Sequence, residues 1–564
     1  MNRVLDELEK ALKRHVRISR VVADKTSRSF LLDVIGVSAG ERWSIKMDLP
    51  GTFPIGKVSF QLLSGGKPHL EHINHAGTIC VSESTGLAVN LDLPTDVGLW
   101  WFDSMVSVMD IATQNALRGN FAPLLDEYAG YFQLTEKFVR VPILNELTDN
   151  SGHLHGHVDR SGKLVAISSG NHKAYPRYAG HRALYRCEKA PLLHLALETP
   201  VLPPKRHSPL GQDLIRSALD AQAPACKARL WRRLEHFGRK RRLRHVLITQ
   251  PRPSGGREHI GISWRMKKSR AANQLLPGEW RDSLLWGLEP HYPKFHLART
   301  GSDRSLSNRS VVIVGCGAVG GYVAMGLAQA GIGRLKLIDF DELRPENLRR
   351  HVLPAEFLGK NKATGLSEWI GSQYPDVDVV ADTSPVIEST HIEAADVVCL
   401  ATGNASLERL VVRQLMADDG SPPVISGWVE ALSLGGQAVL TVKGRPGCLE
   451  CLYTSKDGES LPGSRFGFVA AGEIVDQTLA GCGGAFTPFA GLDANQTASM
   501  MTRMVIEILA NGSTKRFQLW TGPDDAAVNS NISTSSWYQN LRAGRIPGDL
   551  FEHIVNPCCR VCGT

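Results

Sequence analysis

Long hydrophobic runs are absent from this sequence. Hydrophobic residues make up 43% of its 564 positions, but the apolar runs are short and interrupted. A helix that crosses a bilayer needs about 20 consecutive apolar residues, and a secretory leader needs an apolar core near its start. We therefore expect no membrane partner and a cytoplasmic location.

Cysteines are few, and they do not form the evenly spaced framework of a disulfide-rich secreted domain. Several of the 11 cysteines lie in close pairs. This usage is typical of a reducing compartment, where thiols serve as metal ligands or nucleophiles. Individual thiols, rather than disulfides, are therefore the candidates for chemistry.

The chain also lacks a strong excess of either charge. Its formal net charge of +8 is modest for this length, so we do not expect a nucleic-acid partner. Part of the excess falls between Lys227 and Arg244. Within that run, Leu230, Leu234 and Phe237 recur at helical spacing. The spacing predicts an amphipathic helix with a solvated basic face, and an acidic partner or nucleic acid is the alternative use of these charges.

Internal repeats and low-complexity segments are absent too. Because 564 residues are too many for one hydrophobic core, we expect about three domains. Residues 1–140 begin with helical periodicity and continue with β-type runs, which predicts a helix followed by a small antiparallel sheet. Residues 141–304 are rich in Pro, Arg and His and carry no motif that assigns a role. A polar stretch at 299–309 then leads into a third domain, residues 305–564. The predicted fold class is multidomain, α/β and α+β.

The third domain opens with a strand, a tight turn and a helix. Val311–Val314 read as a buried strand, followed by Gly315, Gly317 and Gly320 and then an apolar helical stretch. Glycines let backbone N–H groups approach phosphates, and the helix N-terminus adds partial positive charge. Asp339 ends the next predicted strand, at the distance where dinucleotide-binding folds place a ribose ligand. A nicotinamide or flavin enzyme is therefore one interpretation.

Polar residues further along favour a triphosphate instead. Asp341, Asn347, Arg350 and Lys362 follow in order. Arginine and lysine side chains can neutralise the charge that develops on the α- and β-phosphates as pyrophosphate leaves. A dinucleotide does not need such a set of cations. We therefore predict ATP as the ligand, bound by these residues and the preceding glycines and aspartate.

The order and spacing of these residues resemble the ThiF/MoeB/HesA superfamily, which includes ubiquitin-activating enzymes, from about residue 305 to the C-terminus. The resemblance implies a Rossmann-like adenylation domain that uses ATP and Mg²⁺. It implies that Asp339 holds the ribose and that Arg350 and Lys362 hold the phosphates. Gly403 departs from the pattern, because the family has an aspartate near magnesium there. Asp341 or a neighbouring acid is the expected substitute.

Two cysteine pairs, Cys448 with Cys451 and Cys559 with Cys562, lie far apart in the sequence. In each pair two residues separate the cysteines, which lets both thiolates bind one tetrahedral ion. Two such pairs predict a closed structural zinc site that pins the C-terminal tail to the domain and stabilises the fold. Cys558 is an alternative ligand, and unligated thiols are the alternative interpretation.

Cys482 lies between these pairs, in a glycine-rich stretch before a predicted helix at 495–509. Its small neighbours predict an accessible loop. A thiolate is a good nucleophile toward a carbonyl once its surroundings favour ionisation. By resemblance to the family, Cys482 attacks an acyl adenylate to form a thioester. Otherwise it is a small residue packed in a turn.

The N-terminal part resembles a ubiquitin-conjugating (UBC-fold) enzyme over about residues 1–134. The matching pieces are a proline-rich turn before a strand, a stretch with His72 and Asn74, Cys80 after Gly-Thr-Ile, and a tryptophan loop. The resemblance implies that Cys80 accepts an acyl group. His72 falls where the family has its oxyanion-stabilising asparagine and Asn74 is offset, so the donor stays open. Alternatively, Cys80 is a small hydrophobe in a non-catalytic binding domain.

Activating and conjugating domains on one chain raise the effective concentration of one thiol near the other. Their order resembles the fused proteins of bacterial type II CBASS antiphage operons. That resemblance implies that the protein modifier, which has a free C-terminus, is a cGAS-like CD-nucleotidyltransferase, and that a target amine receives it in antiphage defence. It also implies a homodimer through the adenylation domain. The predicted reaction adenylates the modifier's C-terminal carboxylate, forms a thioester on Cys482, transfers the acyl group to Cys80 and ligates it to an amine such as a lysine.

Two other classes of enzyme remain open at the level of sequence. One is a ThiF/MoeB-type adenylating enzyme for a sulfur carrier or a small substrate, with an N-terminal domain that binds without catalysing. The other is a nicotinamide-dependent oxidoreductase, against which Arg350 and Lys362 argue.

Overall fold

The structure is a computed structural model, and its described residues form two compact units. The first unit runs up to His291 and the second begins at Tyr292. The predicted division into three domains, with boundaries at residues 140 and 304, stays a prediction. The structure describes residues 2–37, 40–81, 89–132, 138–145, 147, 154–169, 188–206, 210–238, 243–265, 283–292, 295, 297, 304–385, 392, 394–478 and 485–563.

The first unit begins with a five-stranded antiparallel sheet in the order β1-β2-β3-β4-β5. Alternate residues of β2, such as Leu32 and Val34, are buried, and so are Leu5, Leu8 and Leu12 at helical spacing on α1. These side chains share one core. The predicted helix and small antiparallel sheet are thus confirmed. The elements are α1 (Asn2–Arg14), β1 (Ile18–Asp24), β2 (Ser29–Ile35), β3 (Arg42–Asp48), β4 (Ser59–Gly65), β5 (Thr78–Ile79), α2 (Pro94–Leu117), α3 (Ala122–Asp126) and η1 (Gly130–Phe132).

An eight-stranded mixed sheet, in the order β10-β11-β12-β13-β6-β8-β7-β9, makes up the rest of the first unit. The predicted basic helix is α5, but it ends at Gly238, and Leu243 already begins β11. The prediction of one helix through Arg244 was therefore too long, because that residue pairs with Trp264 of β12. The elements are β6 (Phe138–Ile143), β7 (Leu154–Val158), β8 (Leu164–Ser169), β9 (Glu188–Pro191), β10 (Leu193–Ala196), α4 (Leu210–Asp220), α5 (Pro224–Gly238), β11 (Leu243–Pro251), β12 (Arg257–Arg265) and β13 (Ser283–Pro290).

The second unit is built on a seven-stranded sheet in the order β16-β15-β14-β17-β18-β19-β22. The first five strands of this order are parallel and the last two are antiparallel to their neighbours. The strand order reverses between β14 and β17, which is where Rossmann-like folds bind ligands. The elements before the reversal and around it are η5 (Arg304–Asn308), β14 (Ser310–Val314), α7 (Ala318–Ala330), β15 (Arg334–Ile338), η6 (Pro345–Asn347), η7 (Ala355–Phe357), α8 (Lys362–Gln373), β16 (Asp378–Asp382), β17 (Val397–Leu400) and α9 (Ala405–Ala417).

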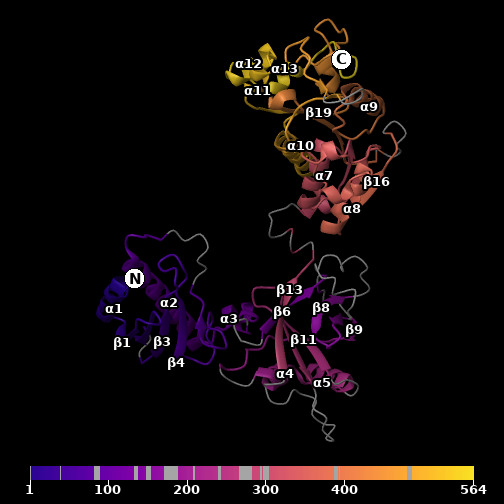
Figure 1. The fold of residues 1–564 in the computed structure, drawn as a ribbon. Coiled ribbons are helices and arrows are strands. Elements are labelled where there is room, and N and C mark those ends of the chain that lie inside the picture. Colours follow the sequence, from indigo (N-terminus) through magenta and orange to yellow (C-terminus); the bar gives the residue numbers. More distant parts are fainter. Residues whose placement is uncertain are drawn as a thin grey trace. The chain divides into compact units, whose positions relative to one another are not determined.

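Helices cover both faces of this sheet (Figure 1). The strand at 310–314 alternates its side chains between two cores, as a buried parallel strand must. The predicted Rossmann-like architecture is confirmed for this unit. Its remaining elements are β18 (Val424–Val429), η9 (Ala431–Ser433), β19 (Gly435–Thr441), η10 (Leu449–Tyr453), β20 (Gln477–Thr478), β21 (Ala485–Phe486), α10 (Gly491–Asn511), β22 (Phe517–Thr521), α11 (Asp525–Asn529), α12 (Ser536–Arg542) and α13 (Leu550–Ile554).

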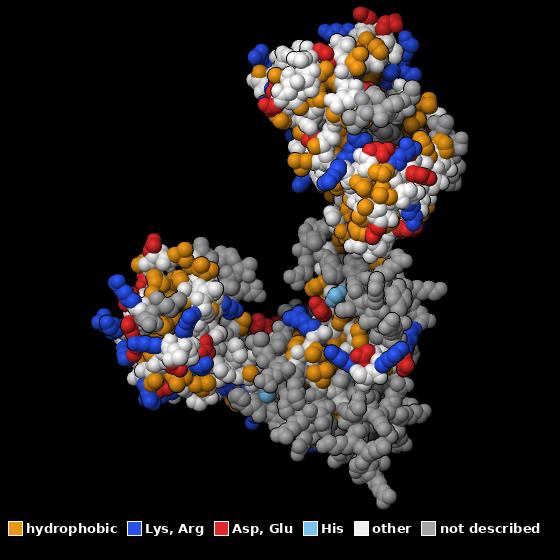
Figure 2. All heavy atoms as spheres, in the orientation of Figure 1, with side chains coloured by type: hydrophobic (Ala, Val, Ile, Leu, Met, Phe, Trp, Pro, Cys, Tyr) orange, Lys and Arg blue, Asp and Glu red, His pale blue; other side chains and the backbone are white. Residues whose placement is uncertain are grey.

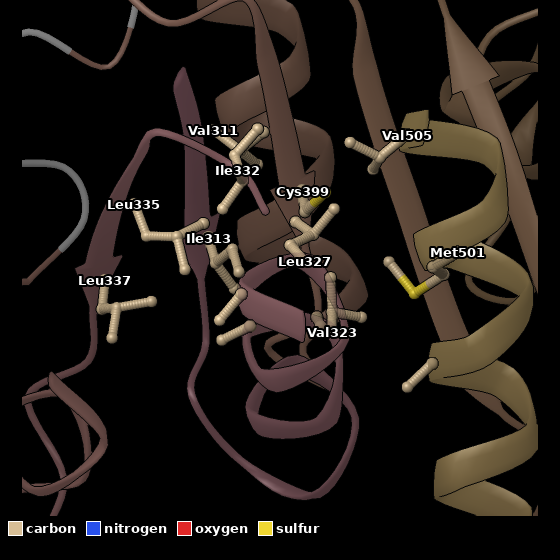
Figure 3. Packing of buried hydrophobic residues seen from close by; sticks show 14 of the residues in the cluster. Val311, Ile313, Val323, Leu327, Ile332, Leu335, Leu337, Cys399, Met501 and Val505 are labelled. Carbon is tan, nitrogen blue, oxygen red and sulfur yellow. The ribbon is translucent and has the colours of Figure 1, made fainter. Parts of the chain in front are cut away.

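One of the two cores fixes the helix that follows the glycine loop. Figure 3 shows Ile313 of β14 facing Val323 and Leu327 of α7, with Met501 and Val505 of α10 on the other side of α7. All five side chains are fully buried. Because each buried aliphatic side chain contributes about 1.5–3 kcal/mol, this packing holds α7 firmly against the strands. The N-terminus of α7 is thereby fixed at the edge of the sheet where β14 ends.

The surface carries both signs of charge. In Figure 2, Lys and Arg side chains are interspersed with Asp and Glu side chains over the face that is drawn. This mixture fits the modest net charge of +8. Within the described ranges, no helix is both long enough and apolar enough to span a bilayer.

Candidate functional site

The glycine turn after β14 is closed by contacts that no other residue would allow. Gly315 has φ +88°, and a Cβ added there would lie 2.6 Å from the carbonyl oxygen of Ala401. A Cβ on Gly320 would lie 1.8 Å from the carbonyl oxygen of Gly315. Gly317 is the N-cap of α7, and a Cβ there would meet no atom within 4 Å. Two glycines thus close the turn, and the third keeps the helix N-terminus open toward a ligand.

A cavity of about 390 Å³ lies where the strand order reverses. It brings together four of the predicted nucleotide-binding residues, Gly317, Asn347, Arg350 and Lys362. Gly315, Gly320, Asp339 and Asp341 are not among the described lining residues. The other residues that line the cavity are Ala318, Val319, His351, Ala401, Thr402, Gly403, Asn404, Ala405, Glu408, Gly427, Trp428, Val429, Leu449, Tyr453, Thr487 and Phe489.

Asp339 and Asp341 make hydrogen bonds that fix the glycine turn and Lys362. The carboxylate of Asp339 accepts hydrogen bonds from the backbone N–H groups of Cys316, at 2.7 Å, and Asp341, at 2.9 Å. The Lys362 ammonium lies 2.5 Å from the carboxylate of Asp341. Burial alone would raise the pKa of Asp341, but the hydrogen bond and charge of Lys362 lower it below its usual value. Asp341 therefore stays ionised and holds the buried Lys362 ammonium at the cavity.

Arg350 is oriented by an aromatic ring. Its guanidinium carbon lies 5.0 Å from the centre of the Phe489 ring, and both residues line the cavity. Cation–π contacts of this kind favour a flat stacked guanidinium and leave its N–H groups available to an anion. The cavity thus presents a lysine, an arginine and a helix N-terminus, a combination that suits phosphates.

Glu408 is a lining residue that the sequence analysis missed. Gly403 has φ +70° and offers no side chain, but Glu408, on the first turn of α9, is the carboxylate among the described lining residues. It accepts hydrogen bonds from the backbone N–H and the hydroxyl of Thr402, both at 2.8 Å. Burial raises the pKa of Glu408 to about 7. The sequence did hold a signal for Glu408, which is an acidic residue in the first turn of the helix after the buried strand β17. A helix N-terminus stabilises a carboxylate at that position.

The four paired cysteines converge in the same unit. The sulfur atoms of Cys448, Cys451, Cys559 and Cys562 all lie within 4.8 Å of one another, with pairs at 3.3, 3.6 and 3.9 Å. Two thiolates on a tetrahedral zinc ion, each at about 2.3 Å, lie about 3.8 Å apart. The cluster therefore fits zinc. Cys558, the alternative ligand, is exposed and lies outside the cluster.

The cysteine cluster adjoins the cavity through η10. Leu449, which lies between the two cysteines of the first pair, and Tyr453, which follows them, line the cavity. Between these cysteines, the buried carboxylate of Glu450 receives two hydrogen bonds from Arg409, at 2.7 and 2.9 Å, and one from Arg413, at 2.5 Å. Both arginines lie on α9, which starts at the cavity. The cluster, α9 and the cavity wall thus form one packed assembly.

Cys482 lies outside the described residues. The segments on either side of it pair as the short strands β20 and β21. Thr487 and Phe489, a few residues beyond β21, line the cavity. The role of Cys482 therefore stays a prediction from the sequence.

In the first unit, His72, Asn74 and Cys80 line a second cavity, of about 550 Å³. Cys80 is exposed, and its backbone N–H donates to the carbonyl oxygen of His72 at 2.7 Å. The ring of His72 lies 3.2 Å from the carboxylate of Glu127, whose hydrogen bond raises the pKa of His72. Exposure of the thiol argues against the alternative of a buried small hydrophobe.

The two candidate oxyanion donors, Asn74 and His72, differ in the hydrogen bonds that they make. Asn74 is 6% exposed, and its side-chain oxygen accepts a hydrogen bond from the backbone N–H of Thr78 at 2.8 Å. Its side-chain nitrogen is buried and has no hydrogen-bond partner among the described residues. A buried amide without a partner costs free energy unless a ligand supplies an acceptor. His72, by contrast, is engaged by Glu127.

Comparisons with known proteins show what the second unit is similar to. Residues 291–540 match the model of the ThiF family. The ATP-dependent ubiquitin transferase-like protein Cap2 of Pseudomonas aeruginosa is 28% identical over 214 residues, which cover 36% of this chain and 37% of that protein. The adenylyltransferase and sulfurtransferase MOCS3 of Danio rerio is 34% identical over 154 residues, which cover 26% of this chain and 32% of that protein.

The match therefore spans less than half the length of each of these relatives. Among solved structures, that of E. coli MccB with ATP aligns with a TM-score of 0.32 and 22% identity, covering 46% of this chain and 68% of that one. The ThiF-like part of the predicted resemblance is supported by the family match. The likeness of the N-terminal part to UBC-fold enzymes stays a prediction.

Proposed function

We propose that this protein is an ATP-dependent activating and conjugating enzyme for a protein modifier. In the first step, the C-terminal carboxylate of the modifier attacks the α-phosphorus of ATP, an acyl adenylate forms and pyrophosphate leaves. In the second, the thiolate of Cys482 attacks the acyl carbon and AMP leaves. In the third, Cys80 takes the acyl group by transthiolation, and an amine then receives it.

The observation that carries the proposal is the cavity where the strand order reverses. It gathers an open helix N-terminus at Gly317 with Arg350 and Lys362, in the part of the chain that matches the ThiF family. Three groups with positive charge or partial positive charge suit a triphosphate better than the two phosphates of a dinucleotide. This arrangement supports ATP over a nicotinamide cofactor.

In this proposal each group around the cavity has a distinct task. Lys362, held by Asp341, and Arg350, stacked on Phe489, neutralise the charge that moves onto the leaving pyrophosphate. Asp339 holds the glycine turn through the N–H of Cys316. By the resemblance noted above, Asp339 would also hold the ribose.

Magnesium and zinc have separate places in the proposal. Magnesium prefers carboxylate oxygens, and Glu408 is the carboxylate among the described residues that line the cavity, so we assign it to hold the ion. Bound magnesium would neutralise phosphate charge. The four thiolates of the cysteine cluster leave no open position for chemistry, so zinc there is structural.

The later steps rest on Cys482 and Cys80. Cys80, which is exposed, and Asn74, whose side-chain nitrogen is buried and has no partner among the described residues, line one cavity. That amide is suited to donate to the oxyanion of the tetrahedral intermediate. The name of the Cap2 relative, an ATP-dependent ubiquitin transferase-like protein, is consistent with this chemistry. By the resemblance noted above, the modifier is a CD-nucleotidyltransferase, the setting is antiphage defence in the cytoplasm, and the enzyme is a homodimer through its adenylation domain.

Equilibrium binding tests the first step. We expect the full-length protein to bind Mg-ATP more tightly than NAD⁺ in isothermal titration calorimetry. Lys362→Ala removes a charge-assisted hydrogen bond to phosphate, worth about 1.5–3 kcal/mol, so the Kd for ATP should rise about 10- to 150-fold. Lys360→Ala is the matched control, because Lys360 pairs with Glu368 and does not line the cavity. Tighter binding of NAD⁺, or equal effects of the two variants, would overturn the proposal.

A further inference from the structure

The cavity at Cys80 is completed by a hairpin from the eight-stranded sheet. Arg252 and Glu258, on β11–β12, line it together with residues of the N-terminal sheet and of α3. The hairpin is held there by Asp126 at the end of α3. The side chain of Asp126 accepts hydrogen bonds from the backbone N–H and the hydroxyl of Ser254, at 3.0 and 2.7 Å, and its carbonyl accepts one from Arg252, at 3.2 Å.

Glu258 is an acidic side chain that is largely buried in the wall of this cavity. The side chain of Glu258 is 17% exposed, and one of its oxygens lies 3.3 Å from Nε of Arg252. Burial raises the pKa of Glu258, and the charge of Asp126 adds to this, while Arg252 opposes it. Asp126, Glu127 and Glu258 line the cavity with Lys57, Arg252 and His72. Glu127 raises the pKa of His72, and above that pKa the carboxylates outnumber the two remaining cations. The wall therefore favours a cationic ligand.

A second and independent observation indicates that the cavity takes a ligand. Asn74 lines the same cavity, and its side-chain N–H₂ is buried and has no partner among the described residues. It needs an acceptor oxygen, which the acyl carbonyl of a thioester on Cys80 would supply. The cavity thus suits an oxygen acceptor at Asn74 and a cation at the carboxylates. A thioester carbonyl would supply the first and the ammonium of an incoming amine the second.

We propose that Glu258 of the β11–β12 hairpin binds the acceptor amine of the transfer reaction, so that the middle region of the chain selects a cationic primary amine for the acyl group on Cys80. The proposal rests on the function proposed above. It gives the region from residue 141 to 304, which carries no motif, a place in the reaction.

Transfer of the acyl group from Cys80 to the amine needs no reactant besides the thioester and the amine. The acceptor enters as an ammonium that donates to the Glu258 carboxylate. It loses one proton to that carboxylate and then to water, and its nitrogen lone pair forms a C–N bond to the acyl carbon. The C–S bond breaks, and its electron pair leaves on the Cys80 sulfur. The nitrogen also loses a second proton, which the sulfur takes up, so the products are an amide and the free thiol.

Discharge of a chemically loaded thioester tests the proposal without the activating reaction. The full chain carrying Cys482→Ala is incubated with a short peptide thioester, and acylation of Cys80 is measured by mass spectrometry. The loaded protein is then mixed with L-lysine, which is a cation, or hydroxylamine, which is neutral at neutral pH. We expect Glu258→Gln to raise the KM for lysine about tenfold while the rate with hydroxylamine is unchanged.

An exposed ion pair in the same region of the chain provides the control variant for structural effects. Glu198 pairs with Arg229 at 2.8 Å, but their side chains are 58% and 56% exposed and do not line the cavity. Glu198→Gln should leave both amines unaffected, and Glu258→Asp should restore part of the preference for lysine. An equal loss with both amines, or no loss with either, overturns the proposal. If Cys80 neither accepts the peptide nor releases it to any amine, the proposed function itself fails.

Discussion

Glu450→Gln is predicted to destabilise the second unit. Glu450 is 3% exposed and receives hydrogen bonds from Arg409, which is 17% exposed, and from Arg413, which is 47% exposed. Removing one partner of a buried ion pair costs about 3–5 kcal/mol, because the other charge stays buried. Since Arg413 can regain water, we expect the lower end, about 3 kcal/mol. For a unit of this size that is about 6–12 °C in Tm.

Scanning calorimetry of the full-length, zinc-loaded protein measures this change in Tm. Glu459→Gln is the control, because Glu459 is exposed in the same segment, and we expect it to change stability by less than about 0.5 kcal/mol. A shift below about 2 °C for Glu450→Gln would refute the reasoning that this ion-pair cluster stabilises η10 and α9.

The pH dependence of the same variant provides a second test. Burial would raise the pKa of Glu450, but Arg409 and Arg413 lower it below its usual value. A lowered pKa in the folded state means that the stabilisation is present above the unfolded-state pKa and is lost as pH falls through the folded-state pKa. The difference in Tm between the wild type and Glu450→Gln should therefore shrink on acidification. A difference that grows with acid would contradict this assignment.

Three further predictions concern the two cavities and the cysteine cluster. Gly320→Ala should abolish ATP binding in calorimetry or prevent folding, because its Cβ would lie 1.8 Å from the carbonyl oxygen of Gly315. Removal of zinc by a chelator should lower the Tm by several degrees and weaken ATP binding, since Leu449 and Tyr453 line the cavity; unchanged ATP affinity would show that the cluster and the cavity are independent. Glu127 raises the pKa of His72, so the ion pair is complete below the unfolded-state pKa of histidine and is lost as pH rises through the folded-state value. Glu127→Gln should lower that pKa in an NMR titration.

The second unit could be predicted well because its signals are local. Gly315 and Gly320 mark a turn in which a Cβ would clash with the backbone, and the strands around them are continuous apolar runs. Helix boundaries moved modestly, so that the helix predicted at 495–509 runs from Gly491 to Asn511. The four cysteines met as their spacing suggested.

The remaining site residues could not be found from spacing, because tertiary contacts define them. Glu408 looks like an ordinary first-turn acid until burial and the cavity show its position. Glu258 reaches the Cys80 cavity through contacts between Asp126 and the β11–β12 hairpin, which are distant in sequence. The middle sheet was missed because several of its strands pair out of sequence order, as β13 with β6 and β7 with β9.

The most direct test of the central claim, an acyl relay that ends on Cys80, is peptide mass spectrometry on full-length Cys80→Ser protein co-expressed with its genomic neighbours. Serine forms an oxyester that is more stable than a thioester, so the passing acyl group is trapped. The account predicts an ester-linked peptide at position 80, whose sequence is the C-terminus of the modifier, and its loss in a second variant that also carries Lys362→Ala. An unmodified position 80 with an acyl group on Cys482 alone would contradict the relay and leave an activating enzyme whose first unit binds without catalysing.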